Sequence, residues 1–323
     1  MNIAILDDYQ DTVRHLACFG KLNGHRVSVF NDSVSDVDAL ATRLADVEAL
    51  VLIRERTVID DALLSRLPKL KLISQTGKIS NHLSLEVCSA HGVAVAVGAG
   101  SPTAPAELTW ALIMAAMRRI PQYSEELRAG RWQQSRGAGL GRVLKGCTLG
   151  IWSYGKIGKL MAGFGRAFGM NVLVWGRDAS TAAARADGYT VATTREDFFA
   201  ASDVISLHLR LNDATRGIVR AADLARMKTD ALIVNTSRAE LVEAGALMSA
   251  LRAGRPGFAA LDVFENEPLG DSPLLKMDNV VCTPHLGYVE QASYELYFGL
   301  AFDNLLAFAS GRPVNIANPQ VLK

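Results

Sequence analysis

The stretch T-L-G-I-W-S-Y-G-K-I-G, residues 148–158, is the part of the chain that decides its fold. Thr148–Trp152 has the apolar character of a buried strand, and the residues after the turn have helical spacing. A glycine-rich turn at a helix N-terminus presents N–H groups that can face a pyrophosphate. Ser153 stands where the ideal G-x-G-x-x-G pattern has its first glycine, whereas Gly155 and Gly158 are in place. Although any tight β-α turn can imitate this pattern, we expect a dinucleotide-binding unit here because a second strand follows at the right distance.

Short apolar runs alternate with amphipathic segments along the rest of the chain. The expected strands are Asn2–Leu6, Arg26–Phe30, Ala49–Ile53, Leu70–Ser74 and Val93–Val97 in the first hundred residues, then Asn171–Trp175, Val204–Leu209, Ala231–Asn235, Phe258–Val263 and Val280–Thr283. The expected helices between the early strands are Val37–Ala45, Asp60–Leu67 and Leu83–His91. Repeated β-then-α units imply parallel sheets that are covered on both faces.

The length of 323 residues suits two domains. Gly98–Pro105 is rich in glycine and proline and is expected to cross between them, and the amphipathic stretch Val289–Ala309 is expected to return to the first. We therefore expect an α/β fold of two doubly wound parallel-sheet domains. A Rossmann dinucleotide-binding domain, residues 101–287, is inserted into a flavodoxin-like substrate domain, residues 1–100 and 288–323.

Composition argues against several classes of partner. The net charge is only +1, so nucleic acid and membrane surfaces are not expected as partners. No run of eighteen apolar residues is present, and acids stand where a signal peptide has lysines. The scattered cysteines form neither a metal-ligand spacing nor a disulfide framework. We expect a cytoplasmic protein without a metal, whose four cysteines are reduced: Cys18, Cys88, Cys147 and Cys282.

The segment from Ala106 to Met117 is predicted to form a helix with few polar residues on any face. Such a helix lies either in a domain core or at a subunit interface. The second alternative gives a mild preference for a homodimer.

The strand Asn171–Trp175 is expected to end at the residue that recognises the adenosine ribose. A carboxylate at this place binds the ribose hydroxyls of NAD and repels the 2′-phosphate of NADP. Here Gly176 and Arg177 follow the strand, which removes the repulsion and adds a guanidinium. We favour NADP over NAD for this reason, although Arg177 could also pair with Asp178 or stack on adenine.

Three polar residues after apolar strands form a candidate proton-transfer and substrate-binding site. Arg238 is expected at the carboxyl end of its strand, where its planar fork can hold a substrate carboxylate, or else cap the next helix. His285 is the candidate acid or base, with His208 as its only positional competitor. Glu267 can fix that imidazole and stabilise its charged form, and Asp262 and Glu265 are rivals for this role.

Five motifs together resemble the D-isomer-specific 2-hydroxyacid dehydrogenase family over nearly the full length of the chain. They are T-L-G-I-W-S-Y-G-K-I-G, V-I-S-L-H-L, N-T-S-R-A, L-D-V-F-E-N-E-P and T-P-H-L-G. The resemblance implies that Arg238 binds substrate, Glu267 orients the acid/base and His285 is that acid/base. It further implies a set of cofactor contacts from Tyr154, Gly155, Lys156, Ile157, Thr236 and Asp262, and a loop around Gly77 and Lys78 that cradles the substrate carboxylate.

The expected function is NAD(P)-dependent hydride transfer between nicotinamide C4 and C2 of a small 2-keto or D-2-hydroxy acid. Reduction of glyoxylate or hydroxypyruvate is favoured, provided that NADPH is the partner. One alternative is a formate-type dehydrogenase, which places glutamine where this chain has Glu267. The other is a nicotinamide-sensing binding protein of the co-repressor type on the same fold.

Overall fold

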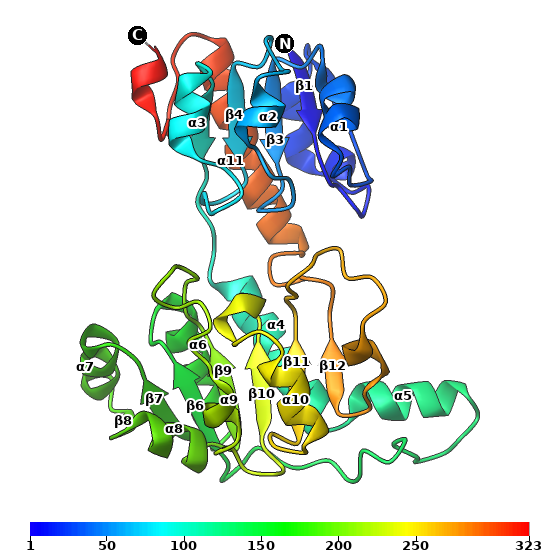
Figure 1. Cartoon of the computed structure of the whole chain (residues 1–323), viewed down its shortest axis with the longest axis vertical. Helices are drawn as coiled ribbons and strands as arrows, with labels where there is room; N and C mark the ends of the chain where they lie inside the picture. Colours follow the sequence, from blue (N-terminus) through cyan, green and yellow to red (C-terminus); the bar gives the residue numbers. More distant parts are fainter. Residues whose placement is uncertain (323) are drawn as a thin grey trace. The chain divides into compact units, whose positions relative to one another are not determined.

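The structure, a computed structural model, describes residues 1–322 and divides them into two compact units. Unit 1 comprises residues 1–101 and 290–322, and unit 2 comprises residues 102–289. The chain leaves unit 1 once, builds unit 2 and then returns, as Figure 1 shows by its colours. Lys323, which ends the expected substrate domain, lies outside the described residues.

Unit 1 is built on a parallel sheet with the strand order β2-β1-β3-β4-β5. Its strands are β1 (Asn2–Ile5), β2 (Arg26–Val29), β3 (Ala49–Leu52), β4 (Leu72–Gln75) and β5 (Ala94–Val97). Its helices are α1 (Val37–Leu44), α2 (Asp61–Leu64), α3 (Leu85–Ala90) and α11 (Gln291–Ala309), with the 3-10 helices η1 (Val13–His15), η2 (Ala17–Leu22) and η5 (Pro319–Leu322). This strand order confirms the expected flavodoxin-like arrangement.

The last long helix, α11, completes the core of unit 1. It packs against η2, β4 and β5, and the Ser74 hydroxyl donates a hydrogen bond of 2.8 Å to the Ala301 carbonyl. Lys21 of η2 forms a 2.7 Å ion pair with Asp303. Glu290 caps the helix by accepting hydrogen bonds from the backbone N–H groups of its first turn. The C-terminal part of the chain therefore belongs structurally to the same unit as its beginning.

Unit 2 contains a wider parallel sheet with the strand order β12-β11-β10-β9-β6-β7-β8. Its strands are β6 (Thr148–Trp152), β7 (Asn171–Trp175), β8 (Thr190–Val191), β9 (Val204–Leu207), β10 (Leu232–Asn235), β11 (Phe258–Leu261) and β12 (Val280–Cys282). Its helices are α4 (Thr103–Met117), α5 (Ile120–Arg128), α6 (Lys156–Ala167), α7 (Asp178–Ala186), α8 (Arg195–Ala201), α9 (Ala221–Leu224) and α10 (Ala246–Arg252), with η3 (Ala239–Leu241) and η4 (Pro273–Lys276). Strand order reverses between β6 and β9, so this is the expected Rossmann sheet with its switch point after β6.

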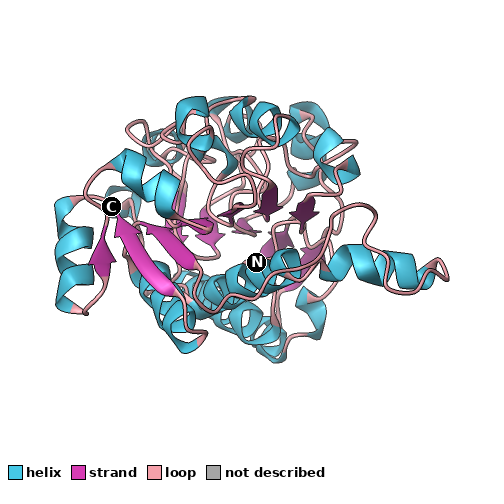
Figure 2. Ribbon diagram, turned by 90° about the horizontal axis from the view of Figure 1, so that it is seen from below, coloured by secondary structure: helices cyan, strands magenta, loops and turns pink. Residues whose placement is uncertain are grey.

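Helices cover both faces of the sheet of unit 2 (Figure 2). One apolar core joins α4 and α6 to the sheet, and a second joins α8, α9 and α10 to the opposite face. Within α4, Ala106 and Ile113 are completely buried, and the helix packs on β10 and β11. Burial in its own domain therefore explains the apolar sequence of α4. Neither α4 nor any other helix among residues 1–322 is long and apolar enough to cross a bilayer.

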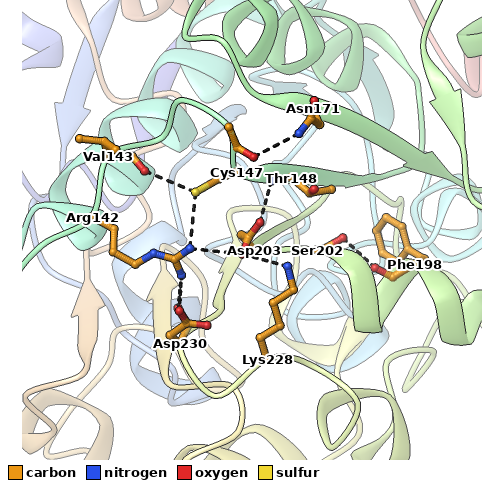
Figure 3. A network of polar contacts seen from close by, with 11 residues as sticks. Arg142, Val143, Cys147, Thr148, Asn171, Phe198, Ser202, Asp203, Lys228 and Asp230 are labelled. Carbon is orange, nitrogen blue, oxygen red and sulfur yellow. Dashed lines mark hydrogen bonds and ion pairs between the residues drawn. The ribbon is translucent and has the colours of Figure 1, made fainter.

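A network of hydrogen bonds and ion pairs lies at the amino-terminal edge of this sheet (Figure 3). Asp203, which directly precedes β9, accepts a 2.8 Å hydrogen bond from the backbone N–H of Thr148 at the start of β6. Its carboxylate also pairs with Lys228 at 3.0 Å and Arg142 at 3.3 Å. Arg142 reaches Asp230 at 2.6 Å as well. The network ties the loop before β6 to β9 and to the loop before β10, at the end of the sheet opposite the glycine-rich turn.

The structure differs from expectation mainly where helices are short or flanked by proline. The helix expected over Asp60–Leu67 spans only Asp61–Leu64, and the N–H groups of Arg66 and Leu67 then form i→i−3 turns to the carbonyls of Leu63 and Leu64. The proline after Leu67 prevents the helix from continuing past it. Helix α5 and the two-residue edge strand β8 were not expected. Strand β8 is too short to show a period, whereas Ile120, Tyr123 and Leu127 of α5 do recur at helical spacing.

Candidate active site

The glycine-rich turn after β6 has the backbone geometry of a phosphate-binding turn. Ser153 has φ +82°, a region that favours glycine, and its N–H donates a 2.8 Å hydrogen bond to the Trp175 carbonyl. A Cβ atom on Gly158 would overlap the carbonyl oxygen of Ser153, which confirms that Gly158 allows α6 to pack closely on the strand. A Cβ atom on Gly155 would meet nothing within 4 Å, so the space before the helix is open. The turn therefore fits the phosphates of a dinucleotide.

The side chain of Tyr154 does not face this open space. It is buried, its hydroxyl donates a 2.9 Å hydrogen bond to Asp187, and its ring packs against Tyr189. Burial and the Asp187 carboxylate raise the pKa of this hydroxyl. Any contact between Tyr154 and a cofactor thus falls to its backbone. Lys156 is exposed and Ile157 half-buried at the start of α6, where both can lie along a bound phosphate or ribose.

Arg177 lies at the carboxyl end of β7 with its side chain exposed, and it is the N-cap residue of α7. Among the described residues it forms no ion pair with Asp178. A Cβ atom on Gly176 would lie 3.2 Å from the Cβ of Ser180 and 3.6 Å from the backbone of Ser153. Gly176 thus places the backbone beside the glycine-rich turn, and Arg177 is an exposed positive side chain at this edge.

The segment after β10 is held by its own side chains. The Asn235 amide donates a 2.8 Å hydrogen bond to the Arg238 carbonyl and accepts one of 3.0 Å from the Ser237 N–H. The Ser237 hydroxyl donates to the Leu207 carbonyl at 2.7 Å. Thr236 lies 2.7 Å from the hydroxyl of Thr109 on α4. This short loop therefore has a fixed path across the ends of β9 and β10.

The Arg238 guanidinium does not cap the helix that follows it. Arg238 is the N-cap residue of η3, but its side chain makes no capping hydrogen bond there. Instead its Nη1 donates a 2.6 Å hydrogen bond to the Ser237 carbonyl, and the side chain is half-buried. The guanidinium is thus held at the carboxyl edge of the sheet, where a doubly wound fold binds its ligands.

His285 and Glu267 form a close pair. Nδ1 of His285 lies 2.6 Å from Oε2 of Glu267, and the other carboxylate oxygen accepts a 2.9 Å hydrogen bond from the Phe264 N–H. The ring of Tyr288 packs edge-on against the imidazole at 5.8 Å. His285 also has φ +54°, an uncommon conformation for a residue with a side chain. With Nδ1 engaged, Nε2 is the atom that can exchange a proton with a ligand.

Electrostatics around Glu267 keep it ionised. Burial raises the pKa of its carboxyl, but the hydrogen bond and charge of His285, the Phe264 N–H and the Arg238 charge outweigh burial. The net pKa of Glu267 therefore lies below its ordinary value of 4.5. Glu265 is exposed. Of the three acids that compete in the sequence, Glu267 is the one that contacts the imidazole.

Asp262 has a different structural role, which was not predicted from the sequence. Its buried carboxylate accepts hydrogen bonds from the Thr283 hydroxyl at 2.6 Å and from the N–H groups of Leu286 at 2.7 Å and Gly287 at 2.9 Å. Burial raises its pKa despite these bonds. Asp262 thus anchors the loop that carries His285, and any contact with a nicotinamide amide adds to this role.

His208, the competitor of His285, occupies a less suitable environment. Its Nε2 lies 2.9 Å from the Ser206 hydroxyl, and burial lowers the pKa of the imidazole to about 4. Such a histidine is neutral near pH 7, and the remaining N–H of a neutral imidazole is far less acidic than that of an imidazolium. The geometry therefore favours His285 for proton transfer.

The residues expected to bind the substrate carboxylate lie in unit 1, on the loop after β4. Gly77 has φ +88° and is buried, which supports the expectation that this turn requires glycine. Lys78 is exposed. A Cβ atom on Gly77 would overlap the guanidinium of Arg54, so Arg54 lies directly against this loop. The Thr76 hydroxyl accepts a 3.0 Å hydrogen bond from the Arg54 N–H, which joins the loop to the end of β3.

Within unit 2 the structure brings most of the expected residues to the carboxyl edge of one sheet. Arg238, Glu267 and His285 follow the neighbouring strands β10, β11 and β12. The glycine-rich turn and Arg177 follow β6 and β7 in the same sheet. Gly77 and Lys78 belong to the other unit. Tyr288 and the anchoring role of Asp262 were missed, although Tyr288 is adjacent to the T-P-H-L-G motif.

Known proteins share this sequence and fold. Residues 110–287 match the family model described as D-isomer specific 2-hydroxyacid dehydrogenase, NAD binding domain. The glyoxylate reductase of Aeropyrum pernix is 37% identical over 88% of this chain and 87% of its own. A crystal structure named putative D-3-phosphoglycerate dehydrogenase, from Ralstonia solanacearum, is 59% identical with a TM-score of 0.98, and the match covers 100% of this chain and 98% of that one. A phosphoglycerate oxidoreductase from Vibrio cholerae is 60% identical with a TM-score of 0.94, covering 96% and 99%.

Proposed function

Because the chain belongs to the D-isomer-specific 2-hydroxyacid dehydrogenase family, we propose that it transfers hydride between C4 of a nicotinamide cofactor and C2 of a small 2-keto or D-2-hydroxy acid. When bound, the cofactor supplies or accepts the hydride. Arg238 holds the substrate carboxylate and polarises the keto oxygen. His285 gives its Nε2 proton to that oxygen during reduction, and Glu267 keeps the imidazole charged and oriented. Gly77 and Lys78 add a backbone N–H and a positive charge for the substrate carboxylate.

The observation that carries this proposal is the 2.6 Å contact between His285 and Glu267, with Arg238 near enough to lower the pKa of that carboxyl. The direct test is a steady-state assay of glyoxylate and hydroxypyruvate reduction with NADH and NADPH in parallel. Turnover dependent on a 2-keto acid is the expected result. Cofactor binding without turnover of any 2-keto acid would favour the nicotinamide-sensing alternative.

A second candidate substrate carries an additional anionic group, as 3-phosphohydroxypyruvate does. The observation that favours it is the guanidinium of Arg54, which lies against Gly77 on the proposed carboxylate-binding loop. Arginine binds phosphate in a bidentate manner. The same assay separates the two candidates through the ratio of kcat/KM for the phosphorylated and unphosphorylated 2-keto acids. A ratio well above one, lost in Arg54→Ala, would identify the phosphorylated substrate.

We expect Arg177 to bind the 2′-phosphate of NADPH. Replacement by serine removes a charge-assisted hydrogen bond worth about 1.5–3 kcal/mol. Arg177→Ser should therefore lower kcat/KM with NADPH by roughly 10- to 100-fold and leave kcat/KM with NADH within twofold. Arg185→Ser, at the other end of α7 and also exposed, is the matched control and should change neither value. An equal loss with both cofactors would show that Arg177 contacts adenine instead.

Replacement of Glu267 by glutamine should alter the pH dependence of reduction. The pKa of Glu267 lies below 4.5, so its carboxylate is ionised throughout the neutral range, and it lies 2.6 Å from Nδ1 of His285. Glu267→Gln removes this negative charge beside the imidazole, and we expect the alkaline fall of kcat/KM to move to lower pH, because a nearby carboxylate favours the charged form of an acid/base group. Profiles measured from pH 5 to 10 test this. Glu265→Gln is the control, and an unmoved profile for Glu267→Gln would assign the role to another group.

We further propose that the protein forms a homodimer through α5 and the loop after it. Figure 1 shows this segment running away from the sheet of unit 2. It exposes large apolar side chains, which on a protein surface mark an interaction site: Ile120, Leu127, Trp132, Leu140 and Val143. Trp132 is 75% exposed and Leu140 is 87% exposed.

Charged residues on this segment should separate the subunits. We expect the wild type to sediment at the mass of a dimer and the double variant Trp132→Glu, Leu140→Glu to sediment as a monomer, because carboxylates lose hydration in an apolar interface. Leu275→Glu, at a residue of unit 2 that is 54% exposed, is the control and should remain dimeric. A double variant with the mass of the wild type would remove this segment from the interface.

A further inference from the structure

A cavity of about 270 Å³ lies in unit 2 behind the proposed catalytic groups. Its walls come from α10, from the residues before it and from the loop between β11 and η4. Most of the lining is aliphatic or aromatic and includes Val242, Leu247, Met248, Leu261, Phe264 and Leu274. Val242 and Leu261 are buried, so the inner wall belongs to the core of the unit. The reaction proposed above does not require this cavity.

Two residues of the cavity wall also hold the proposed catalytic groups. The amide of Asn235 donates to the Arg238 carbonyl at 2.8 Å and thereby fixes the loop that carries the guanidinium. The N–H of Phe264 donates to Glu267 at 2.9 Å on the side opposite His285. A molecule packed against Asn235 and Phe264 would therefore restrict both the substrate-binding arginine and the partner of the acid/base.

The charges at the cavity define the class of ligand. The ionisable residues in its lining are two acids, Glu243 and Glu265, and no basic residue contributes to the wall. Both are exposed, and Glu243 in addition accepts a hydrogen bond of 3.0 Å from the Ala221 N–H. Anions, including the 2-keto acids themselves, are disfavoured there. A cavity of 150 Å³ accommodates benzene, so this volume suits a compact apolar body of roughly ten heavy atoms.

We propose that this cavity is a regulatory site for a small apolar amine, which acts on Arg238 and Glu267 through Asn235 and Phe264. The ammonium group lies toward Glu265 and the apolar body lies against Leu247, Met248 and Phe264. The effect on catalysis rests on the proposed function, whereas binding does not depend on it.

Binding is tested with three probes of similar size and different charge. They are N,N-dimethylphenethylamine, 2-phenylethanol and 3-phenylpropanoate, and the tertiary amine cannot condense with a keto acid. A ligand that binds only the folded protein raises its melting temperature. We expect the amine to bind most tightly in thermal-shift and calorimetric titrations, with a stoichiometry of one per chain, and the carboxylate not to bind. Tightest binding of the carboxylate, or no binding of the amine, would overturn the proposal.

Two variants locate the bound amine. Met248→Trp fills the cavity and should weaken amine binding by at least tenfold. Glu265→Gln lies at the surface and should weaken it by roughly two- to fivefold, as expected for an exposed ion pair. Glu196→Gln, at an exposed glutamate on α8, is the control and should bind as the wild type does. Unchanged affinity in both cavity variants would place the amine elsewhere and refute the site.

Regulation is tested by kcat/KM for the keto acid at saturating amine. We expect it to rise at least threefold in the wild type and to stay constant in Met248→Trp. No change in the wild type, with binding demonstrated, would refute the regulatory role. If the amine binds and no 2-keto acid is turned over, the proposed function fails while the binding site stands.

Discussion

His285→Asn should lower kcat for 2-keto acid reduction by about 10²–10⁴-fold, the usual contribution of general acid catalysis. Asparagine is the informative replacement because it tolerates a positive φ, and His285 has φ +54°. The variant therefore removes the proton donor without adding backbone strain. Fluorescence titration should give an NADPH dissociation constant within twofold of the wild-type value.

A second histidine provides the control for this experiment. Nε2 of His91 lies 2.7 Å from Asp61, so His91 also contacts a carboxylate, but it lies in unit 1 at the end of α3. His91→Asn should leave kcat unchanged. Full activity of His285→Asn would exclude His285 as the acid, whatever the effect of its neighbours.

Arg238→Ala should lower kcat/KM by roughly 10²–10⁴-fold. Hydrogen bonds to a charged group contribute about 1.5–3 kcal/mol each, and a guanidinium makes two of them to a carboxylate. Loss of the carboxylate contact should raise KM, since the carboxylate is bound in the ground state as well as in the transition state, and loss of the polarisation of the keto oxygen should lower kcat. Arg238→Lys should recover only part of the activity, because an ammonium group cannot reproduce the planar fork.

Added guanidinium ion gives a sharper test of this assignment. It should partly restore turnover in Arg238→Ala, because the small cation can occupy the space of the missing side chain. Arg226→Ala removes an exposed arginine of the same unit and should behave as the wild type does. If Arg238→Ala retains wild-type kcat/KM, the substrate carboxylate is held elsewhere.

The fold was predictable from the sequence because its signals are local and periodic. Apolar runs of strand length alternate with amphipathic helices, and the turn at 153–158 carries a glycine where the helix packs closely on the strand, although Ser153 takes a φ of +82°. Gly158 illustrates this, since a Cβ atom there would overlap the Ser153 carbonyl. Strand β8 was missed because two residues are too short to show a period, and α5 was missed although its apolar residues recur at helical spacing. The exposed apolar residues of α5 and of the loop after it could not be recognised either, because a short stretch of sequence does not show which side chains are exposed.

The candidate site could be predicted only in part. Because parallel strands end at one edge of a sheet, the sequence alone placed Arg238, Glu267 and His285 in the same region. It did not decide which acid meets the imidazole. The tertiary structure decided which acid contacts His285. The loops bring Glu267 to 2.6 Å from His285, whereas the Asp262 carboxylate accepts hydrogen bonds from the backbone N–H groups of residues 286 and 287.

The sequence by itself determined the succession of most strands and helices along the chain, and it determined the protein family. Both follow from the hydrophobic period and the glycine spacing, which are properties of neighbouring residues. The tertiary structure decided what each side chain contacts. It turned the ring of Tyr154 toward Asp187, set Arg54 against Gly77, and left a cavity behind Asn235. These contacts join residues far apart in the chain, so they depend on how whole elements pack, and no local pattern specifies them.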